Sequence, residues 1–181
     1  MFLEEVLRRL RVNKIKKYIK NGAVVCDIGC GQSAFLLKSI KNSISKGYGF
    51  DKKIDNLKKD NLEICHSNLA KEINLPSNSI DVITLLAVLE HVEYPEDILK
   101  DCYRPLKDSG RIIITTPAPR SKNLLEFLAF KFNILSQEEI GSHLRYFNLS
   151  ELKDLLIKLG FKIVKAQQFQ FGFNNFIVAQ K

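Results

Sequence analysis

A valine-rich apolar run that ends in an acid and two glycines constrains this chain more than any other feature. The stretch is 24-VVCDIGCGQSAFL-36. Its apolar part, residues 23–28, predicts a short buried strand, and residues 34–40 have helical spacing. Gly29 and Gly31 lie between them, where glycine permits a positive φ and lets the backbone touch a ligand without a Cβ in the way. This order of strand, glycine turn and helix predicts a nucleotide-cofactor site at the end of the strand.

The rest of the chain alternates between strand and helix patterns. Further strands are predicted at 46–50, 61–66, 80–86, 111–116, 161–168 and 176–180, and helices at 2–20, 88–92, 96–104 and 151–159, the last capped by Ser150. Such alternation implies right-handed crossovers, whereas the last two strands lie too close together for a helical crossover and should pair antiparallel. We therefore expect one α/β domain over residues 1–181, with a Rossmann-like seven-stranded, mostly parallel sheet, an antiparallel last strand and helices on both faces.

Charge and composition indicate the cellular compartment and the kinds of partner to expect for this chain. It has 181 residues, of which 45% are hydrophobic, and a net charge of +8. No apolar run is long enough to span a bilayer, and charged residues interrupt the N-terminal stretch where a secretory signal would be apolar. The four cysteines, Cys26, Cys30, Cys65 and Cys102, form no CxxC pair, so we expect reduced thiols in a cytoplasmic protein rather than a zinc site. The charge favours a nucleic-acid or anionic-membrane partner, although a lysine-rich solvated surface explains it more simply.

Two classes of cofactor use a glycine turn of this shape. Residues 29–34 match the dinucleotide pattern G-x-G-x-x-A, and Asp51 follows about twenty residues later, where a carboxylate can bind ribose hydroxyls in either class. Asp27 favours the second class, because a carboxylate at the end of the first strand repels a pyrophosphate and attracts a cation. S-adenosylmethionine carries both an ammonium and a sulfonium. The chain length also leaves little room for the second half of a dinucleotide-binding fold.

Five motifs in the right order resemble class I S-adenosylmethionine-dependent methyltransferases over nearly the whole chain. VCDIGCGQSAFL is similar to the first motif with its D-x-G-x-G core, and GYGFD to the second. HSNLAKEINLPSNSIDVITL is similar to the third strand, the adenine-contacting loop and the entry to the fourth strand. LLAVLEHVEYPEDILKDCYRPLKDSGRIIITTP and SHLRYFNLSELKDLLIKLGF resemble the subgroup that includes ubiquinone-pathway and small-molecule enzymes. The resemblance implies S-adenosyl-L-methionine as cofactor and S-adenosyl-L-homocysteine as product.

The resemblance also implies which residues hold the cofactor, all of them near the ends of the first four strands. The methionine part is assigned to Asp27, Gly29 and Gly31, with Cys30 between the two glycines, and the ribose to Asp51. Phe50 or Lys52 is assigned to the flank of the adenine, Asn68 and Leu69 to its edge, and Leu85 and Leu86 to the methyl-donor side. Asn68 stands where the family usually has an acid, and its amide oxygen can accept the same hydrogen bond.

Two positions depart from the family pattern. Ser33 replaces the third glycine of the first motif, where its hydroxyl is suited to capping the following helix. Some ubiquinone-type members carry Glu three residues before a Glu-His pair, and the three side chains bind a divalent cation. Here Glu90 and His91 are present, but Ala87 takes the place of that Glu, so no metal is expected.

The expected chemistry is methyl transfer to O or N of a small-molecule acceptor by in-line displacement. A sulfonium is already an activated donor, so the protein chiefly excludes water and aligns the acceptor. A base helps where the acceptor is a hydroxyl or an ammonium, and His143 and His91 are the candidates, with Glu90 as an orienting or electrostatic group. Each has a structural alternative: both histidines can serve as surface hydrogen-bonding groups, and Glu90 can fix local backbone or Arg145.

Two segments are expected to shape acceptor binding. The N-terminal stretch 1–21 predicts a basic amphipathic helix that forms a lid over the cofactor, as the family often has. The variable segment 120–147 carries more apolar residues than one helix stripe uses. These residues are suited to an acceptor pocket, a homodimer contact through 120–135, contact with a membrane surface, or simple burial against the sheet. An RNA methyltransferase and a non-catalytic cofactor-binding partner subunit of the same fold remain the alternatives, and nucleic acid is not the favoured partner.

Overall fold

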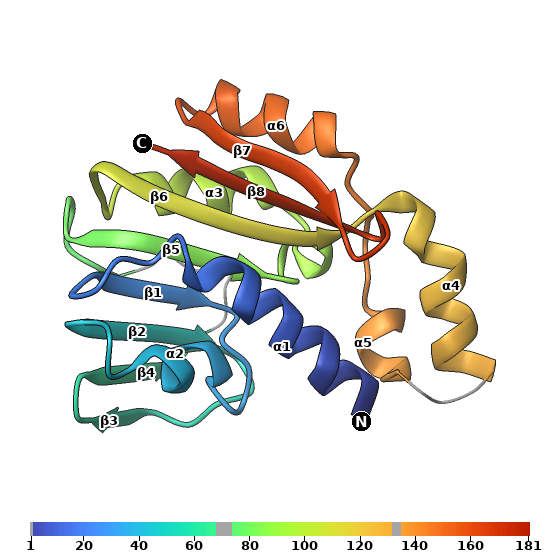
Figure 1. The fold of residues 1–181 in the computed structure, drawn as a ribbon, viewed down its shortest axis with the longest axis horizontal. Coiled ribbons are helices and arrows are strands. Elements are labelled where there is room, and N and C mark those ends of the chain that lie inside the picture. The colour runs from blue at the N-terminus through green and yellow to red at the C-terminus, as the bar shows by residue number, and fades with distance from the viewer. Residues whose placement is uncertain (1, 68–73, 132–134) are drawn as a thin grey trace.

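The computed structural model describes residues 2–67, 74–131 and 135–181, and most of its strands form a parallel sheet (Figure 1). The strands are β1 (Val24–Ile28), β2 (Lys46–Asp51), β3 (Leu57–Lys59), β4 (Leu62–His66), β5 (Ile80–Leu86), β6 (Leu106–Pro117), β7 (Lys162–Phe169) and β8 (Asn174–Gln180). The α-helices are α1 (Phe2–Lys16), α2 (Phe35–Ile40), α3 (Pro95–Tyr103), α4 (Lys122–Glu126), α5 (Gln137–Gly141) and α6 (Leu149–Lys158). Shorter turns of helix are η1 (Leu89–His91), η2 (Pro119–Ser121) and the π-helical η3 (Phe127–Lys131).

The sheet has the order β3-β4-β2-β1-β5-β6-β8-β7. Strands β4, β2, β1, β5 and β6 run parallel, and β8 pairs antiparallel with both β6 and β7. The predicted Rossmann-like, mostly parallel sheet with antiparallel pairing at its C-terminal end is therefore confirmed. Strand order reverses between β1 and β5, and ligands in such sheets bind beyond the carboxyl ends of the strands at this point.

The described sheet contains eight strands rather than the seven expected. The additional strand, β3, pairs antiparallel with β4 at the edge of the sheet, and its three residues are exposed. A three-residue strand with two lysines has no hydrophobic period, so the sequence pattern did not reveal it. Strand β6 also begins earlier than residue 111, because residues 108–110 lie inside it as an irregularity, with Ser109 at a φ of 67°.

Helices cover both faces of the sheet, as predicted. On one face, side chains of α1 and α2, including Ile15 and Leu37, pack against Val25 and Val82 of the central strands. On the other face, Leu99 of α3 and Leu156 of α6 belong to the larger apolar core. Figure 1 shows α1 crossing the sheet and projecting beyond the arrowheads, where α4 and α5 also stand.

Three local predictions about helix ends are wrong. Helix α1 ends at Lys16 rather than residue 20, and the chain continues through turns to Gly22, whose φ is 77°. Helix α6 is capped by Asn148, which forms a capping box with Glu151. The helix therefore begins before Ser150. Ser33 does not cap α2, because Ala34 is the N-cap and makes no side-chain cap bond.

No helix within the described part of the chain is both long enough and apolar enough to cross a membrane.

Candidate cofactor and acceptor site

The turn between β1 and α2 is held by backbone hydrogen bonds to β2, and it leaves open space beside one of its glycines. The backbone N–H groups of Gly29 and Cys30 donate to the carbonyl oxygen of Phe50, at 2.8 and 3.1 Å, which ties the turn to the end of β2. Gly29 has a φ of 70°, and an added Cβ would lie 2.4 Å from the Cγ2 atom of Val88. Gly31 has a φ of 67°, but an added Cβ there would meet no heavy atom within 4 Å. Gly29 thus serves packing, whereas Gly31 leaves room for a ligand to approach the backbone.

Asp27 is a buried acid at the end of β1. Its side chain is 3% exposed, and its Oδ1 atom accepts a hydrogen bond of 2.5 Å from the Thr84 hydroxyl on β5. Burial raises the pKa of Asp27 to about 7, and the charge of Asp51 adds to this, while the Thr84 hydrogen bond opposes it. Among the described residues, no lysine or arginine forms an ion pair with Asp27. A cationic ligand would stabilise the ionised form of this carboxyl.

Asp51 ends β2 and faces the same turn. Its Oδ2 atom accepts a hydrogen bond from Gly31 N, and its Oδ1 atom accepts one from Lys53 N, both at 2.8 Å. These bonds fix the carboxylate orientation yet use one lone pair on each oxygen, so each oxygen keeps capacity for a hydroxyl donor. The carboxylate is partly exposed, as a group that binds ribose hydroxyls must be.

The other residues expected to bind cofactor lie in varied surroundings. Phe50 and Leu85 are buried in the core, Leu86 is half-buried and Lys52 is exposed. Cys30 packs with Ala34 and Ile64, and burial raises the pKa of its thiol well above the ordinary value, which suits a packing role rather than a reactive one. Asn68 and Leu69 lie outside the described residues.

The three candidate catalytic residues, Glu90, His91 and His143, come together although 52 residues separate the two histidines. Glu90 and His91 lie in η1, directly after β5, while His143 follows α5. A backbone hydrogen bond of 2.8 Å from Leu144 N to Glu90 O joins the two segments, and the imidazole centroids are 4.8 Å apart. We call these three residues the histidine cluster.

The electrostatic state of the histidine cluster is set mainly by burial. Burial raises the pKa of Glu90 to about 8, although its own backbone N–H and the charge of Arg11 act to lower it. Burial, and then the neighbouring His91, lowers the pKa of His143 to about 4. Near neutral pH, therefore, Glu90 favours its protonated form and His143 its neutral form, in which one ring nitrogen can accept a proton.

Helices α1 and α5 reach over the same edge of the sheet. Arg8 of α1 donates a hydrogen bond of 3.3 Å to the Ser33 hydroxyl, and its guanidinium lies 4.8 Å from the centre of the Phe35 ring. Lys53, after β2, forms an ion pair of 2.8 Å with Glu138 of α5. The sequence did not reveal these contacts or the Thr84 hydrogen bond, since each joins residues far apart in the chain.

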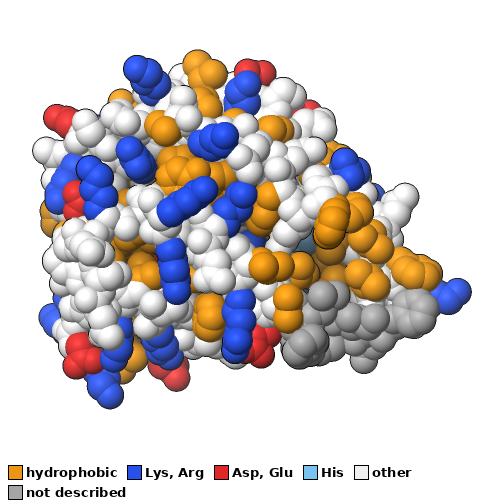
Figure 2. Space-filling view, viewed as in Figure 1, with side chains coloured by type: hydrophobic (Ala, Val, Ile, Leu, Met, Phe, Trp, Pro, Cys, Tyr) orange, Lys and Arg blue, Asp and Glu red, His pale blue; other side chains and the backbone are white. Residues whose placement is uncertain are grey.

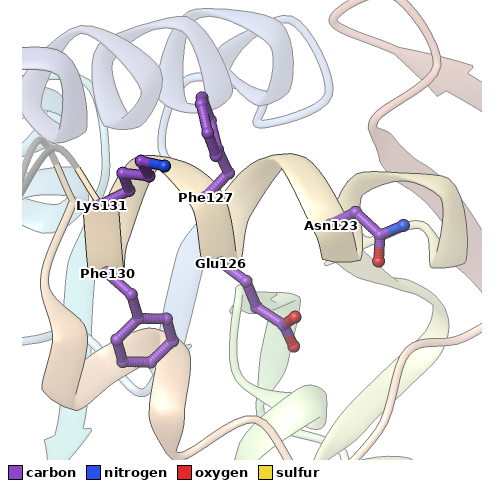
Figure 3. Close-up of a pocket in the computed structure, with 5 residues that line it drawn as sticks. All are labelled: Asn123, Glu126, Phe127, Phe130 and Lys131. Atoms are coloured by element: carbon purple, nitrogen blue, oxygen red, sulfur yellow. The ribbon is translucent and has the colours of Figure 1, made fainter.

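The variable segment 120–147 forms η2, α4, η3 and α5. An open groove of about 590 Å³ lies along α4 and η3, lined by Asn123, Glu126, Phe127, Phe130 and Lys131. Figure 3 shows Glu126 and Phe130 pointing to one side of the helix and Phe127 to the other. The groove lies on this segment and contains none of the residues that surround the glycine turn.

Comparison with known proteins identifies the class to which this fold and site belong. A family model described as "Methyltransferase domain" matches residues 2–166, so the chain belongs to this family of methyltransferase domains. The resemblance to class I S-adenosylmethionine-dependent methyltransferases is thereby confirmed.

Individual relatives agree with this class. A "Probable S-adenosylmethionine-dependent methyltransferase" of Mycolicibacterium smegmatis is 31% identical over 102 residues, covering 56% of this chain and 36% of the relative. A ubiquinone biosynthesis O-methyltransferase of Glaesserella parasuis is 29% identical over 135 residues, covering 67% and 57% respectively. The chain thus spans roughly a third to just over half of the length of the first curated relatives it matches.

A solved structure supports the fold. It belongs to the complex between the Haloferax volcanii Trm112 methyltransferase activator and a methyltransferase, with a TM-score of 0.73 and 13% identity over 94% of this chain and 93% of the other.

Proposed function

We propose that this chain transfers a methyl group from S-adenosylmethionine to O or N of a small-molecule acceptor. One observation carries the proposal: an acid that is 3% exposed and has no ion-pair partner among the described residues stands at the end of β1, beside a glycine that leaves open space. A buried carboxylate that lacks an ion-pair partner is costly, and a cationic ligand offsets that cost. A diphosphate would raise that cost, because its negative charges repel the carboxylate.

The residues at this edge fit the parts of such a cofactor. Asp27 would attract the ammonium end, the open side of Gly31 would admit the ligand to the backbone, and Asp51 would accept the ribose hydroxyls. Asn68 and Leu69 are proposed for the adenine on the strength of the family resemblance. The bound cofactor supplies a methyl group on a sulfonium, which needs no further activation.

Proton removal from the acceptor is proposed for the histidine cluster. His143 is neutral near pH 7, and its Nδ1 atom lies 3.0 Å from the Tyr146 hydroxyl, which orients the ring. His91 contacts Ser142 through Nδ1 and lies edge-on to His143, so it positions that ring. Glu90 would act by holding the segment around Leu144 through its backbone and by its charge state.

Water exclusion and acceptor choice are proposed for the two helical segments over the edge. Arg8 connects α1 to the turn at Ser33, which supports a lid role for residues 1–21. Segment 120–147 exposes Leu124, Phe127 and Phe130, which are 38%, 48% and 55% exposed, and Figure 2 shows hydrophobic side chains gathered on that side of the molecule. We propose that these apolar side chains contact the acceptor, with a homodimer contact through 120–135 as the alternative use.

RNA is the second candidate acceptor, favoured by the net charge of +8. Lys and Arg side chains are scattered between neutral ones on the face shown in Figure 2, rather than gathered in one stripe. A small molecule therefore remains the leading acceptor.

The test combines binding with turnover. The intact chain is heated with S-adenosylmethionine, S-adenosylhomocysteine or NAD, and is then incubated with S-adenosylmethionine and a broad metabolite panel while S-adenosylhomocysteine release is measured. Stabilisation by the two adenosyl compounds and release with a metabolite are expected. Release only with RNA would transfer the proposal to the second candidate. Binding without release from any acceptor would identify a non-catalytic partner subunit.

A further inference from the structure

Thr84 is a buried polar residue in the apolar second half of β5. The strand reads IDVITLL, and Thr84 is 0% exposed between Ile83 and Leu85, which are buried to the same degree. Its register partner on β1 is Asp27, so the two side chains lie next to each other on the same face of the sheet. A buried hydroxyl costs free energy unless it is hydrogen-bonded, so its partner indicates why a polar residue stands here.

The Thr84 hydroxyl binds one oxygen of Asp27. Its Oγ1 atom lies 2.5 Å from Oδ1 of Asp27 and 3.4 Å from the carbonyl oxygen of Cys26. A hydroxyl carries a single proton, and the shorter contact has the length of a hydrogen bond from a hydroxyl to a carboxylate. Thr84 therefore donates to the ionised carboxylate, and the Cys26 carbonyl is the weaker alternative acceptor.

This bond fixes the orientation of the Asp27 carboxyl group. Threonine is branched at Cβ and has few χ1 rotamers, and complete burial restricts the Thr84 side chain further. The hydroxyl is thus held in one direction. Because Oδ1 of Asp27 is occupied by this donor, Oδ2 is the oxygen left to accept a hydrogen bond from a ligand.

The other surroundings of Asp27 disfavour its ionised form. Burial raises the pKa of Asp27, and the charge of Asp51 on β2 raises it further. The neighbouring thiols of Cys26 and Cys30 are buried, which raises their pKa well above the ordinary value, so they stay neutral and supply no positive charge. The Thr84 hydrogen bond acts in the opposite direction and lowers the pKa of Asp27. Without it, less of the carboxylate would be ionised near neutral pH.

We propose that Thr84 is a positioning residue for the methyl donor, because its hydroxyl holds the carboxylate of Asp27 ready for the cationic end of that donor. Thr84 orients the carboxylate and favours its ionised form, and it needs no contact with the ligand. Serine keeps the hydroxyl and should replace threonine here, whereas valine keeps only the shape. The donor role rests on the proposed function, but the bond between Thr84 and Asp27 is present in the ligand-free chain.

The bond is tested first without any ligand. The intact chain is labelled with carbon-13 at the aspartate carboxyl groups and titrated with acid and base while NMR spectra are recorded, and Asp27→Asn identifies the Asp27 signal. In Thr84→Val, the midpoint of the Asp27 titration should rise by about one pH unit, since a hydrogen bond to the ionised form is lost. In Thr84→Ser the midpoint should change much less.

Donor binding is then measured by calorimetry with S-adenosylhomocysteine, which keeps the ammonium group of the donor. Thr84→Val should weaken the affinity about fivefold at pH 7, because a pKa one unit higher leaves about a fifth as much carboxylate. At about pH 8.5, where most of the carboxylate is ionised in both chains, the loss should fall below about twofold. A threonine with only a structural role would weaken binding equally at both pH values. Thr84→Ser should restore most of the affinity.

Thr116→Val is the matched control. It makes the same substitution at a fully buried threonine of β6, whose hydroxyl accepts a hydrogen bond from Asn175 instead of donating to an acid. The titration of Asp27 and the affinity for S-adenosylhomocysteine should equal those of the parent. Thermal unfolding in mild acid, where Asp27 is neutral, verifies that each variant folds.

An unchanged titration of Asp27 in Thr84→Val would overturn the proposal, whether or not the cofactor binds. A shifted titration with no loss of affinity at pH 7 would also overturn it, as would equal losses at both pH values or the same loss in Thr84→Ser. If the parent bound neither S-adenosylmethionine nor S-adenosylhomocysteine, the proposed function would fail together with the donor role of Thr84. The titration would still decide whether Thr84 controls the ionisation of Asp27.

Discussion

The cofactor edge around the glycine turn and the histidine cluster differ in how the chain builds them. At the cofactor edge, Asp27, Gly29 and Gly31 lie within five residues, and Asp51 reaches them from the adjacent strand through a 2.8 Å bond to Gly31 N. The histidine cluster joins η1 to a segment 52 residues later through one backbone bond. Under the proposed function, donor binding would therefore depend on a local motif, whereas acceptor chemistry would depend on how a variable segment packs. We expect acceptor preference to change more readily than cofactor use among chains of this fold.

The two glycines should separate packing from ligand access within the cofactor edge. Gly29→Ala should lower the free energy of unfolding by about 2–4 kcal/mol, because its Cβ meets Val88 and its φ is positive. Gly31→Ala should cost only about 1–2 kcal/mol, since only the positive φ is unfavourable. Chemical denaturation measures both. Equal losses in the free energy of unfolding would mean that the two glycines do not have separate roles, one in packing and the other in ligand access.

Asp51→Ala should weaken cofactor binding by more than tenfold. The substitution removes a carboxylate that can accept two charge-assisted hydrogen bonds from a ribose, and it also releases the Gly31 and Lys53 backbone N–H groups. Isothermal calorimetry with S-adenosylhomocysteine measures the change, and Asp55→Ala, an exposed acid on the same loop, is the control. An unchanged affinity in Asp51→Ala would remove the ribose assignment.

Cofactor affinity should rise about fivefold to tenfold between pH 6 and pH 8. The pKa of Asp27 is about 7, so the carboxylate that attracts the cationic ligand forms over this interval. Asp27→Asn should flatten the profile when affinity is measured by calorimetry across the range. If the affinity of the parent changed as little with pH as that of the variant, Asp27 would not interact with the charge of the ligand.

Asp27 should also make the stability of the ligand-free chain depend on pH. The folded pKa of Asp27 lies above its unfolded value of 3.8, so folding favours the neutral carboxyl. The stability that Asp27 contributes is fully present below about pH 4 and is lost as the pH rises through 7. Thermal unfolding of Asp27→Asn should show a weaker decline over this interval. A decline that is unchanged in the variant would assign it to other groups.

The smallest effect is expected at the lid. Arg8→Ala should weaken cofactor binding about twofold to threefold, because it removes one hydrogen bond to Ser33 and one cation–π contact with Phe35. Arg9→Ala is the matched control, since Arg9 pairs with Glu5 on the exposed surface of the same helix. Equal behaviour of the two variants in calorimetry would argue against a lid role for α1.

Much of the fold was predictable because its signals are local. The apolar run before Asp27 and the glycines after it predicted the first strand and turn, and the parallel direction of the central strands followed from alternation with helices. The short edge strand β3 was missed because its lysines carry no apolar period, and the cap at Asn148 was missed because Ser150 offered an equivalent local signal. The proximity of His143 to Glu90 could not be seen in the sequence, since only packing brings the two residues together.

The proposed function depends most on a cationic methyl donor being the ligand of the glycine turn. Calorimetric titration of the intact chain with S-adenosylmethionine and with NAD under identical conditions tests this directly. We predict saturable binding of S-adenosylmethionine at one per chain, lost in Asp51→Ala, and no competition from NAD. Saturable NAD binding that excludes S-adenosylmethionine would contradict it.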